Sequence, residues 1–294
     1  AYVLDPRYPE VREFIINTYV KALKDWNLDG FKFDFLGRFR AGKDTELTAE
    51  KGRDYASVNA ATDRLMTDVM QSLKNIKPDI LIEFRQPYTG PAMRKYGNMF
   101  RAGDCPNVAI MNRVRTTDLR LLSGNTAVHA DMLMWHYSEP PEVAALQLLN
   151  VLFSVPQISV RLNDIPRSHF EMIRFYTNYW LKNRSVLLEG EFIPVNPLMN
   201  YPLIKGNDGE KEIIALFTDM TVKIETLKFN SFDVVNAKSS KRVILDVKGQ
   251  PQSFSCAIID CKGKMMEQKT IKLETGVYVF DVPPSGMITF EQAK

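Results

Sequence analysis

Apolar and polar positions alternate with two different periods over the first two-thirds of the chain. Over residues 9–26 the apolar side chains recur at helical spacing. After Gly30 the period becomes two, so that Lys32 and Asp34 alternate with phenylalanines. This change of period predicts a helix followed by a strand with one charged side and one apolar side. The phenylalanines on the apolar side are Phe31, Phe33 and Phe35.

The same alternation continues to residue 185. Further strands are predicted at residues 80–85, 98–104, 127–132 and 157–162. Further helices are predicted at residues 58–77, 112–122, 142–153 and 168–184. Ser168 and Glu171 have the spacing of a capping box, which predicts that the last helix starts at Ser168.

Strands that alternate with helices through short loops predict an α/β fold with a parallel sheet and right-handed crossovers. Five such units are too few to close a (β/α)8 TIM barrel, and the chain opens on a helix that needs a strand before it. We therefore expect residues 1–185 to be the C-terminal portion of a catalytic barrel, about strands 4 to 8, with about three units before it. The alternative is a complete doubly wound sheet, which the lack of a Gly-rich phosphate turn disfavours.

Residues 186–294 carry short apolar stretches separated by turn residues, without helical patterns. This pattern predicts a C-terminal all-β antiparallel sandwich domain. No cluster of candidate catalytic residues lies there, so we expect the chemistry in residues 1–185. The predicted strands are residues 213–217, 243–247, 254–259, 277–280 and 287–290.

Composition narrows the choice of partners. The chain has 294 residues and a net charge of only +3, which argues against nucleic-acid and membrane-surface partners because both need clustered positive charge. No apolar run reaches the roughly 18 residues of a membrane span. Three cysteines without a CxxC motif predict neither a disulfide framework nor a metal site, and we expect no cofactor. A cytoplasmic and an exported location both stay open.

Lys32 and Asp34 are charged side chains that a barrel would turn inward. Asp34 lies near the C-terminal end of its strand, where barrel active sites are built. Because an inward charge is costly without a partner or a function, we interpret Asp34 as a catalytic carboxylate that Lys32 keeps ionised. The alternative is a structural ion pair with Lys32 or with a neighbouring strand.

Asp104 ends a strand two units later, behind the small residues Ala102 and Gly103. Its alternative role is to cap the next helix. Together, Asp34 and Asp104 supply the two carboxylates that glycoside hydrolysis requires, one at the anomeric carbon and one at the leaving oxygen. This pair predicts a glycosidase that acts on an oligosaccharide or another glycoside.

Other residues at or near strand ends suit sugar binding. Arginine, aspartate and histidine can bond hydroxyl groups, and Trp135 offers a face to a sugar ring. For Trp135 and His136 the alternative is packing beneath the loops. The candidates are Arg85, Arg101, His129, Asp131, Trp135 and His136.

A rival interpretation uses the same strand ends for Mg²⁺. Asp34, Glu83 and Asp104 end three consecutive strands and could bind the ion, with Lys32 as the base for proton abstraction. Glu83 lies two residues before Arg85 and is therefore expected below the site, which disfavours this interpretation.

Residues 28–34 read Leu-Asp-Gly-Phe-Lys-Phe-Asp and resemble the Lys-x-Asp nucleophile strand of glycoside hydrolase family 36, the α-galactosidase (melibiase) family of clan D. Residues 101–105 resemble its acid/base segment. Residues 4–11, 127–135 and 156–159 are similar to further segments in the same order. The resemblance implies a retaining exo-α-glycosidase, with α-galactose as the first expected glycone, Asp34 as nucleophile and Asp104 as acid/base. In the family these residues lie on the fourth and sixth strands, which agrees with three preceding units.

Three departures from the family pattern keep a second function open. Leu36 stands where many members carry Asn, Gly103-Asp104-Cys105 replaces Ser-Asp-x-Thr-Asp, and residues 38–55 replace a shorter loop. They motivate the alternative of a non-catalytic carbohydrate-binding relative and leave the glycone open. We also expect the chain alone to hydrolyse nothing measurable and to form homo-oligomers through its open sheet edge.

Overall fold

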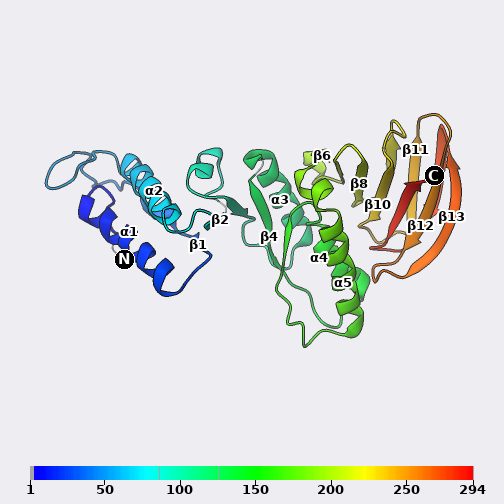
Figure 1. The fold of residues 1–294 in the computed structure, drawn as a ribbon, viewed down its shortest axis with the longest axis horizontal. Helices are drawn as coiled ribbons and strands as arrows, with labels where there is room; N and C mark the ends of the chain where they lie inside the picture. Colours follow the sequence, from blue (N-terminus) through cyan, green and yellow to red (C-terminus); the bar gives the residue numbers. More distant parts are fainter. Residues whose placement is uncertain (1–2, 86, 125, 294) are drawn as a thin grey trace. The chain divides into compact units, whose positions relative to one another are not determined.

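The structure, a computed structural model, describes residues 3–85, 87–124 and 126–293. It divides into two compact units, both drawn in Figure 1. Unit 1 contains Ala1–Arg101 and Leu119–Val128, and unit 2 contains Ala102–Asp118 and His129–Lys294. The predicted domain boundary between residues 185 and 186 stays a prediction.

A parallel sheet follows the predicted alternation of strands and helices. Its order is β1-β2-β3-β4-β5, and each pair with a described register runs parallel. The predicted α/β architecture is thereby confirmed. The strands are β1 (Gly30–Phe33), β2 (Leu81–Arg85), β3 (Met99–Arg101), β4 (Ala127–Leu133) and β5 (Val155–Ile158). The helices are α1 (Pro9–Asp25), α2 (Val58–Lys74), α3 (Ala109–Ser123), α4 (Pro141–Leu149) and α5 (Arg167–Lys182).

In unit 1, one face of the sheet is closed by buried aromatic side chains. Phe33, Phe84 and Phe100 come from β1, β2 and β3, and each is at most 4% exposed. Helix α2 buries the predicted apolar stripe and packs beside α1 (Figure 1). Gly30 allows β1 to approach β2, because a Cβ at this position would lie 2.0 Å from the carbonyl oxygen of Leu81.

The local expectations for Phe35 and Ser168 are wrong. Phe35 does not continue the apolar side of β1: its φ of 58° is left-handed and its side chain is 55% exposed, because the extended backbone ends at Phe33. Ser168 does not cap α5, because Pro166 occupies the N-cap with extended dihedrals. Glu171 instead accepts a 2.9 Å hydrogen bond from Arg167 Nε.

The β-domain of unit 2 is a sandwich of two sheets. Their orders are β13-β12-β15-β10-β8-β7-β6 and β14-β11-β9, and a shared apolar core lies between them. Most pairs are antiparallel as predicted, whereas the β8–β10 and β9–β11 pairs run parallel. The strands are β6 (Glu191–Val195), β7 (Leu203–Asn207), β8 (Lys211–Leu216), β9 (Thr221–Ile224), β10 (Ser231–Asn236), β11 (Arg242–Val247), β12 (Gln252–Ile259), β13 (Met265–Leu273), β14 (Gly276–Asp281) and β15 (Met287–Gln292).

A second apolar core lies on the other face of the seven-stranded sheet. Met172 and Tyr176 of α5 pack in one cluster with Ile213 of β8, Val235 of β10 and Met287 of β15. This cluster joins the last helices of the α/β region to the β-domain within unit 2. Of the helices in the described ranges, none is long and apolar enough to cross a bilayer.

Candidate active site

Asp34 lies directly after the C-terminal end of β1, and its carboxylate is held by two donors. Arg85 Nε donates to Oδ2 over 2.9 Å, and the Phe35 backbone N–H donates to Oδ1 over 2.7 Å. Because Arg85 ends the neighbouring strand β2, the parallel pairing brings both side chains to one end of the sheet. This is the strand end at which barrel enzymes place catalytic groups.

The surroundings of Asp34 favour its ionised form. Partial burial by itself raises the pKa of the carboxyl group, but the hydrogen bonds from Arg85 and Phe35 and the charges of Arg85 and Lys32 outweigh it. The resulting pKa of Asp34 lies below the ordinary value of 3.8. The carboxylate is therefore an anion at neutral pH, as a nucleophile requires.

Phe35 turns the chain sharply at the candidate nucleophile. A left-handed conformation is uncommon for a bulky residue and stores strain that the surrounding structure must support. The Phe35 ring has two cationic neighbours, with the Arg38 guanidinium 4.9 Å and the Arg85 guanidinium 5.9 Å from its centroid. Phe35 and Arg38 were not among the sequence candidates, since their contacts depend on this turn.

The charged side of the sheet continues below Asp34. Lys32 Nζ lies 3.5 Å from Glu83 Oε1, and Arg101 Nε lies 3.8 Å from the same oxygen. These residues come from β1, β2 and β3, so one carboxylate links three neighbouring strands. Lys32 is therefore paired with Glu83, while its charge also lowers the pKa of Asp34. The structural alternative for Asp34 was an ion pair with Lys32 or with a neighbouring strand, and Asp34 does form an ion pair, with Arg85 of the neighbouring strand β2.

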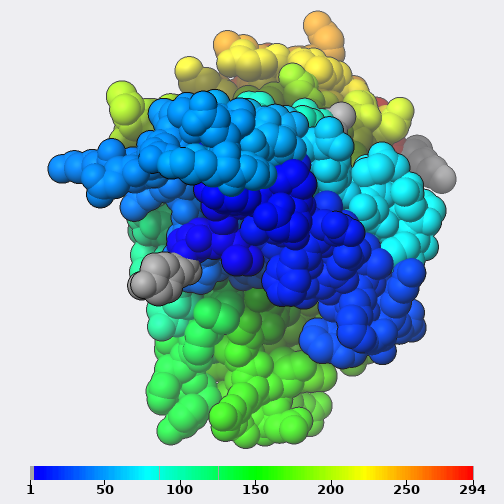
Figure 2. Space-filling model, turned by 90° about the vertical axis from the view of Figure 1, so that its left-hand side faces the viewer, coloured from blue at the N-terminus to red at the C-terminus, as the bar shows by residue number. Residues whose placement is uncertain are grey.

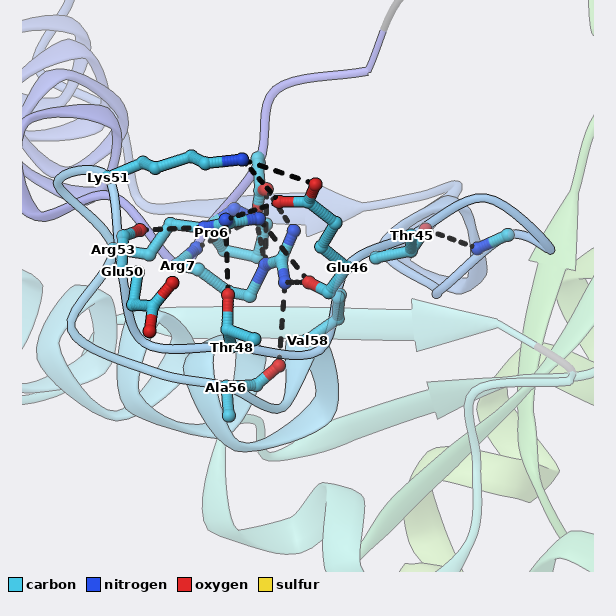
Figure 3. A network of polar contacts seen from close by, with 12 residues as sticks. Pro6, Arg7, Thr45, Glu46, Thr48, Glu50, Lys51, Arg53, Ala56 and Val58 are labelled. Carbon is cyan, nitrogen blue, oxygen red and sulfur yellow. Dashed lines mark hydrogen bonds and ion pairs between the residues drawn. The ribbon is translucent and has the colours of Figure 1, made fainter.

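A long loop follows β1 and leads to α2. The short helical turn Leu36–Arg38 is followed by residues 39–57, and the blue segment that includes them projects from the surface in Figure 2. Two buried arginines, Arg7 and Arg53, both donate to the Glu46 carbonyl oxygen (Figure 3). Arg53 Nη2 also donates to Glu46 Oε2 over 3.1 Å. Buried cations therefore fix the conformation of this loop.

Asp104 does not end a strand as predicted: β3 ends at Arg101, and Asp104 lies in the bend that follows it, in unit 2. Its side chain is exposed, and its backbone carbonyl accepts a 2.8 Å hydrogen bond from Arg115 Nη1 of α3. The next residue, Cys105, donates its backbone N–H to the Asp131 carboxylate. Both bonds hold the peptide group that joins Asp104 to Cys105, directly after the Asp104 side chain.

Asp131 lies in β4 and is fully buried, so its position suits support of the Asp104 bend better than contact with a ligand. Its backbone N–H donates to Asn112 Oδ1 over 3.0 Å, and Asn112 Nδ2 donates back to its carbonyl oxygen over 3.4 Å. The sequence did not indicate Asn112 as a candidate, because its contact with Asp131 depends on how α3 packs on β4.

Trp135 follows β4 and contacts His169. Its Nε1–H donates to His169 Nδ1 over 3.1 Å, so His169 Nε2 carries the proton that is donated to the Glu139 carbonyl oxygen at 2.7 Å. Trp135 also packs against the apolar cluster of α4 and α5, which agrees with the packing alternative. His136 is exposed and bonds Ser138, and His129 Nδ1 lies 3.1 Å from the Ala130 carbonyl oxygen.

The residues named for metal binding are not gathered into a ligand set. Within residues 3–85, 87–124 and 126–293, no group of three or more His, Cys, Asp or Glu side chains is placed to hold a metal ion. Asp34 bonds Arg85, and Glu83 faces two cations.

Comparison with known proteins finds likeness in structure and not in sequence. Neither a protein-family model nor a curated protein matches the chain. The GH36 α-galactosidase AgaA from Geobacillus stearothermophilus matches with a TM-score of 0.61 at 13% identity, over 99% of this chain and 39% of that enzyme. AgaB from the same organism matches with a TM-score of 0.60 at 13% identity, over 98% of this chain and 39% of AgaB.

An α-amylase from Anoxybacillus, described as representing a new glycosyl hydrolase subclass, has a similar fold. Its TM-score is 0.54 at 10% identity, over 97% of this chain and 64% of the amylase. This chain therefore spans about two-fifths of the length of the galactosidases and less than two-thirds of the amylase. Identities this low show the fold alone: a parallel α/β sheet followed by a β-domain, as in glycoside hydrolases.

Proposed function

We propose that this chain is the barrel portion and β-domain of a retaining exo-α-glycosidase that removes terminal α-linked galactose. The observation that carries the proposal is Asp34, an ionised carboxylate that two donors hold at the C-terminal end of a parallel strand. The Lys-x-Asp spacing and the fold of the galactosidases support the choice of sugar.

In the first step, Asp34 attacks the anomeric carbon while Asp104 protonates the leaving oxygen. Each carboxylate oxygen of Asp34 has one protein donor, so a lone pair remains for attack. The products are a glycosyl ester on Asp34 and the free aglycone. In the second step, Asp104 takes a proton from water, and this water hydrolyses the ester with net retention.

The remaining candidates have separate roles in this proposal. Arg85 orients Asp34 and keeps it ionised, and Lys32 adds to the positive potential. Arg101 holds Glu83 beneath them. Asp131 positions the bend that carries Asp104 through Cys105, and Trp135 lines the sugar site with the part of its ring that remains exposed.

The roles of the two carboxylates can be separated by leaving-group chemistry in the full gene product. Asp34→Ala abolishes turnover of both an aryl α-galactoside and raffinose. Asp104→Ala reduces raffinose hydrolysis by about 10²–10⁴-fold and aryl hydrolysis by less, because a nitrophenolate leaves without a proton. Asp29→Ala, a change at an exposed carboxylate in the same segment, is the matched control. Near-wild-type turnover by Asp34→Ala or Asp104→Ala contradicts the assignment.

A non-catalytic sugar-binding protein is the second candidate. The observation that favours it is that Arg85 already pairs with Asp34, beside Leu36 where many family members carry Asn. Calorimetry with galactose and raffinose distinguishes the two candidates. Binding without release of galactose from raffinose by the full gene product supports this second function and contradicts the first.

A further inference from the structure

A cavity of about 400 Å³ lies in unit 2, and none of the candidate active-site residues is among the residues that line it. Helix α5 forms one wall, and the adjoining strands β8, β10, β15, β12 and β13 of the seven-stranded sheet form the other. Its volume lies within the roughly 300–1,000 Å³ typical of small-molecule sites.

The sheet face beneath α5 changes from apolar to polar along its strands. On β10, Val235 belongs to the apolar cluster under α5, and Asp233, two residues earlier, lines the cavity. On β15, Met287 belongs to that cluster and borders the cavity, and Thr289, two residues later, also lines the cavity. Residues two apart share one face of a strand. The sheet face that carries the apolar cluster under α5 therefore carries polar side chains at the floor of the cavity.

Asp233 is the most buried charged group of the floor. It is 1% exposed, and its Oδ2 lies 2.7 Å from Lys211 Nζ and accepts a 2.7 Å hydrogen bond from the Tyr179 hydroxyl. Burial raises the pKa of Asp233, although Lys211 and Tyr179 partly oppose this. The contacts fix an acceptor beside an ammonium donor, and one hydroxyl group of a ligand can bond to both.

The chemistry of the lining is balanced. The lining contains two cations, Lys182 and Lys211, and two carboxylates, Asp233 and Glu291. These charges balance, so the lining favours neither an anionic nor a cationic ligand. Amide and hydroxyl side chains provide further hydrogen bonds, and apolar side chains provide flat contacts. The hydrogen-bonding side chains include Asn178, Asn183, Ser255, Gln268 and Thr289, and the apolar ones include Phe175, Ile259 and Met265.

We propose that this cavity is a binding site for a neutral mono- or disaccharide, separate from the candidate active site. A sugar combines many hydroxyl groups, which donate and accept, with apolar C–H faces. It therefore matches the paired acceptor and donor, the amides and the apolar wall together. The inference rests on residues of α5 and the β-domain alone and does not depend on hydrolysis by Asp34.

The test uses methyl NMR, because two methionines line the cavity. In the full gene product carrying Asp34→Asn to prevent turnover, galactose and raffinose shift the methyl signals of Met265 and Met287 in a saturable way. The signal of Met66, buried in α2 of unit 1, stays in place. Absence of saturable shifts at Met265 and Met287 overturns the proposal. Tighter binding of galacturonate or galactosamine than of galactose also overturns it, because the site would then select a charge.

Variants on one strand localise the binding. Ser255→Phe fills the cavity and weakens galactose binding by about tenfold or more, equivalent to about 1.4 kcal/mol. Ser253→Phe changes the same face of β12 outside the cavity and leaves binding unchanged. Gln268→Ala, on exposed β13, weakens binding without affecting the core, and thermal unfolding checks that each variant folds. Unchanged affinity in both Ser255→Phe and Gln268→Ala contradicts the site, whatever happens to hydrolysis.

Discussion

Arg85 of β2 and Asp34 after β1 are joined by a 2.9 Å hydrogen bond from Nε to Oδ2. Both side chains are less than a third exposed, so solvent screens the pair only in part. The pairing of two parallel strands thereby orients a carboxylate at their C-terminal ends. The proposed chemistry depends on this orientation and on the ionisation that accompanies it.

Replacing Arg85 by Gln should move the acidic limb of the pH profile. The arginine lowers the pKa of Asp34, whereas burial raises it, so Arg85→Gln raises the pKa. The acidic limb of kcat/KM then shifts to higher pH. Lys32→Gln is the matched control and shifts the limb less, because Lys32 acts on Asp34 only through its charge. An unshifted limb in Arg85→Gln contradicts the role of Arg85.

The Arg85–Asp34 pair also predicts how the free energy of unfolding changes with pH. Because the folded-state pKa of Asp34 is depressed, its stabilising contribution is present above the ordinary value near 3.8 and disappears as pH falls through the folded-state value. The difference in free energy of unfolding between wild type and Asp34→Asn should therefore shrink on acidification below pH 3.8. Urea titrations at several pH values measure it, and a difference that grows on acidification contradicts this sign.

Two phenylalanines close together in sequence should differ strongly in their contribution to stability. Phe33 is 4% exposed among other rings, so Phe33→Ala costs about 3–5 kcal/mol of unfolding free energy. Phe35 is 55% exposed and left-handed, and Phe35→Ala changes stability by only about 0.5 kcal/mol. Urea denaturation followed by circular dichroism measures both. Equal losses would mean that Phe35 packs on the apolar side after all.

Asp131 should affect turnover through the bend that carries Asp104. Asp131→Leu removes the acceptor of the Cys105 N–H, and the resulting displacement lowers kcat by up to about 100-fold. Asp131→Asn keeps an acceptor oxygen and restores part of the rate, which loss of packing alone does not explain. If the Asn and Leu variants are equally impaired while both remain folded, Asp131 has another role.

The loop after β1 should depend on its buried arginines. Arg53→Met removes hydrogen bonds to Glu46 and Glu50, and limited proteolysis should then cut residues 39–57 faster. Lys51→Met is the control, since exposed Lys51 bonds the exposed carboxylate of Glu46. Equal cleavage of the two variants would show that the arginine network does not hold the loop.

The periodic parts of the fold could be predicted from the sequence. A period of two between Gly30 and Phe33 identified β1, and the helical stripe of residues 58–73 identified α2. The turn at Phe35 could not be predicted, because phenylalanine has no preference for left-handed backbone and the alternation of polarity continues through it. The capping box at Ser168 was outweighed by Pro166, whose fixed φ starts the helix earlier.

For the candidate site, the sequence could predict only which types of residue lie at the strand ends. Asp34 and Arg85 end neighbouring strands, so the sequence could place both at one edge of the sheet, but not their hydrogen bond. Asp131 was expected to bind sugar. Its complete burial and its bond to Cys105 depend on the packing of α3 and β4, for which one sequence carries no signal.

Trapping the covalent intermediate tests the central claim most directly. A fluorinated α-galactosyl fluoride slows hydrolysis of the ester, so the full gene product should gain the mass of one fluorosugar on the peptide that contains Asp34. Asp34→Asn should gain none, and Asp29→Asn should be labelled like the wild type. Labelling confined to Asp34 is the result that we predict. A wild-type protein that turns over α-galactosides but carries its label on another residue would contradict the assignment of Asp34 as the nucleophile.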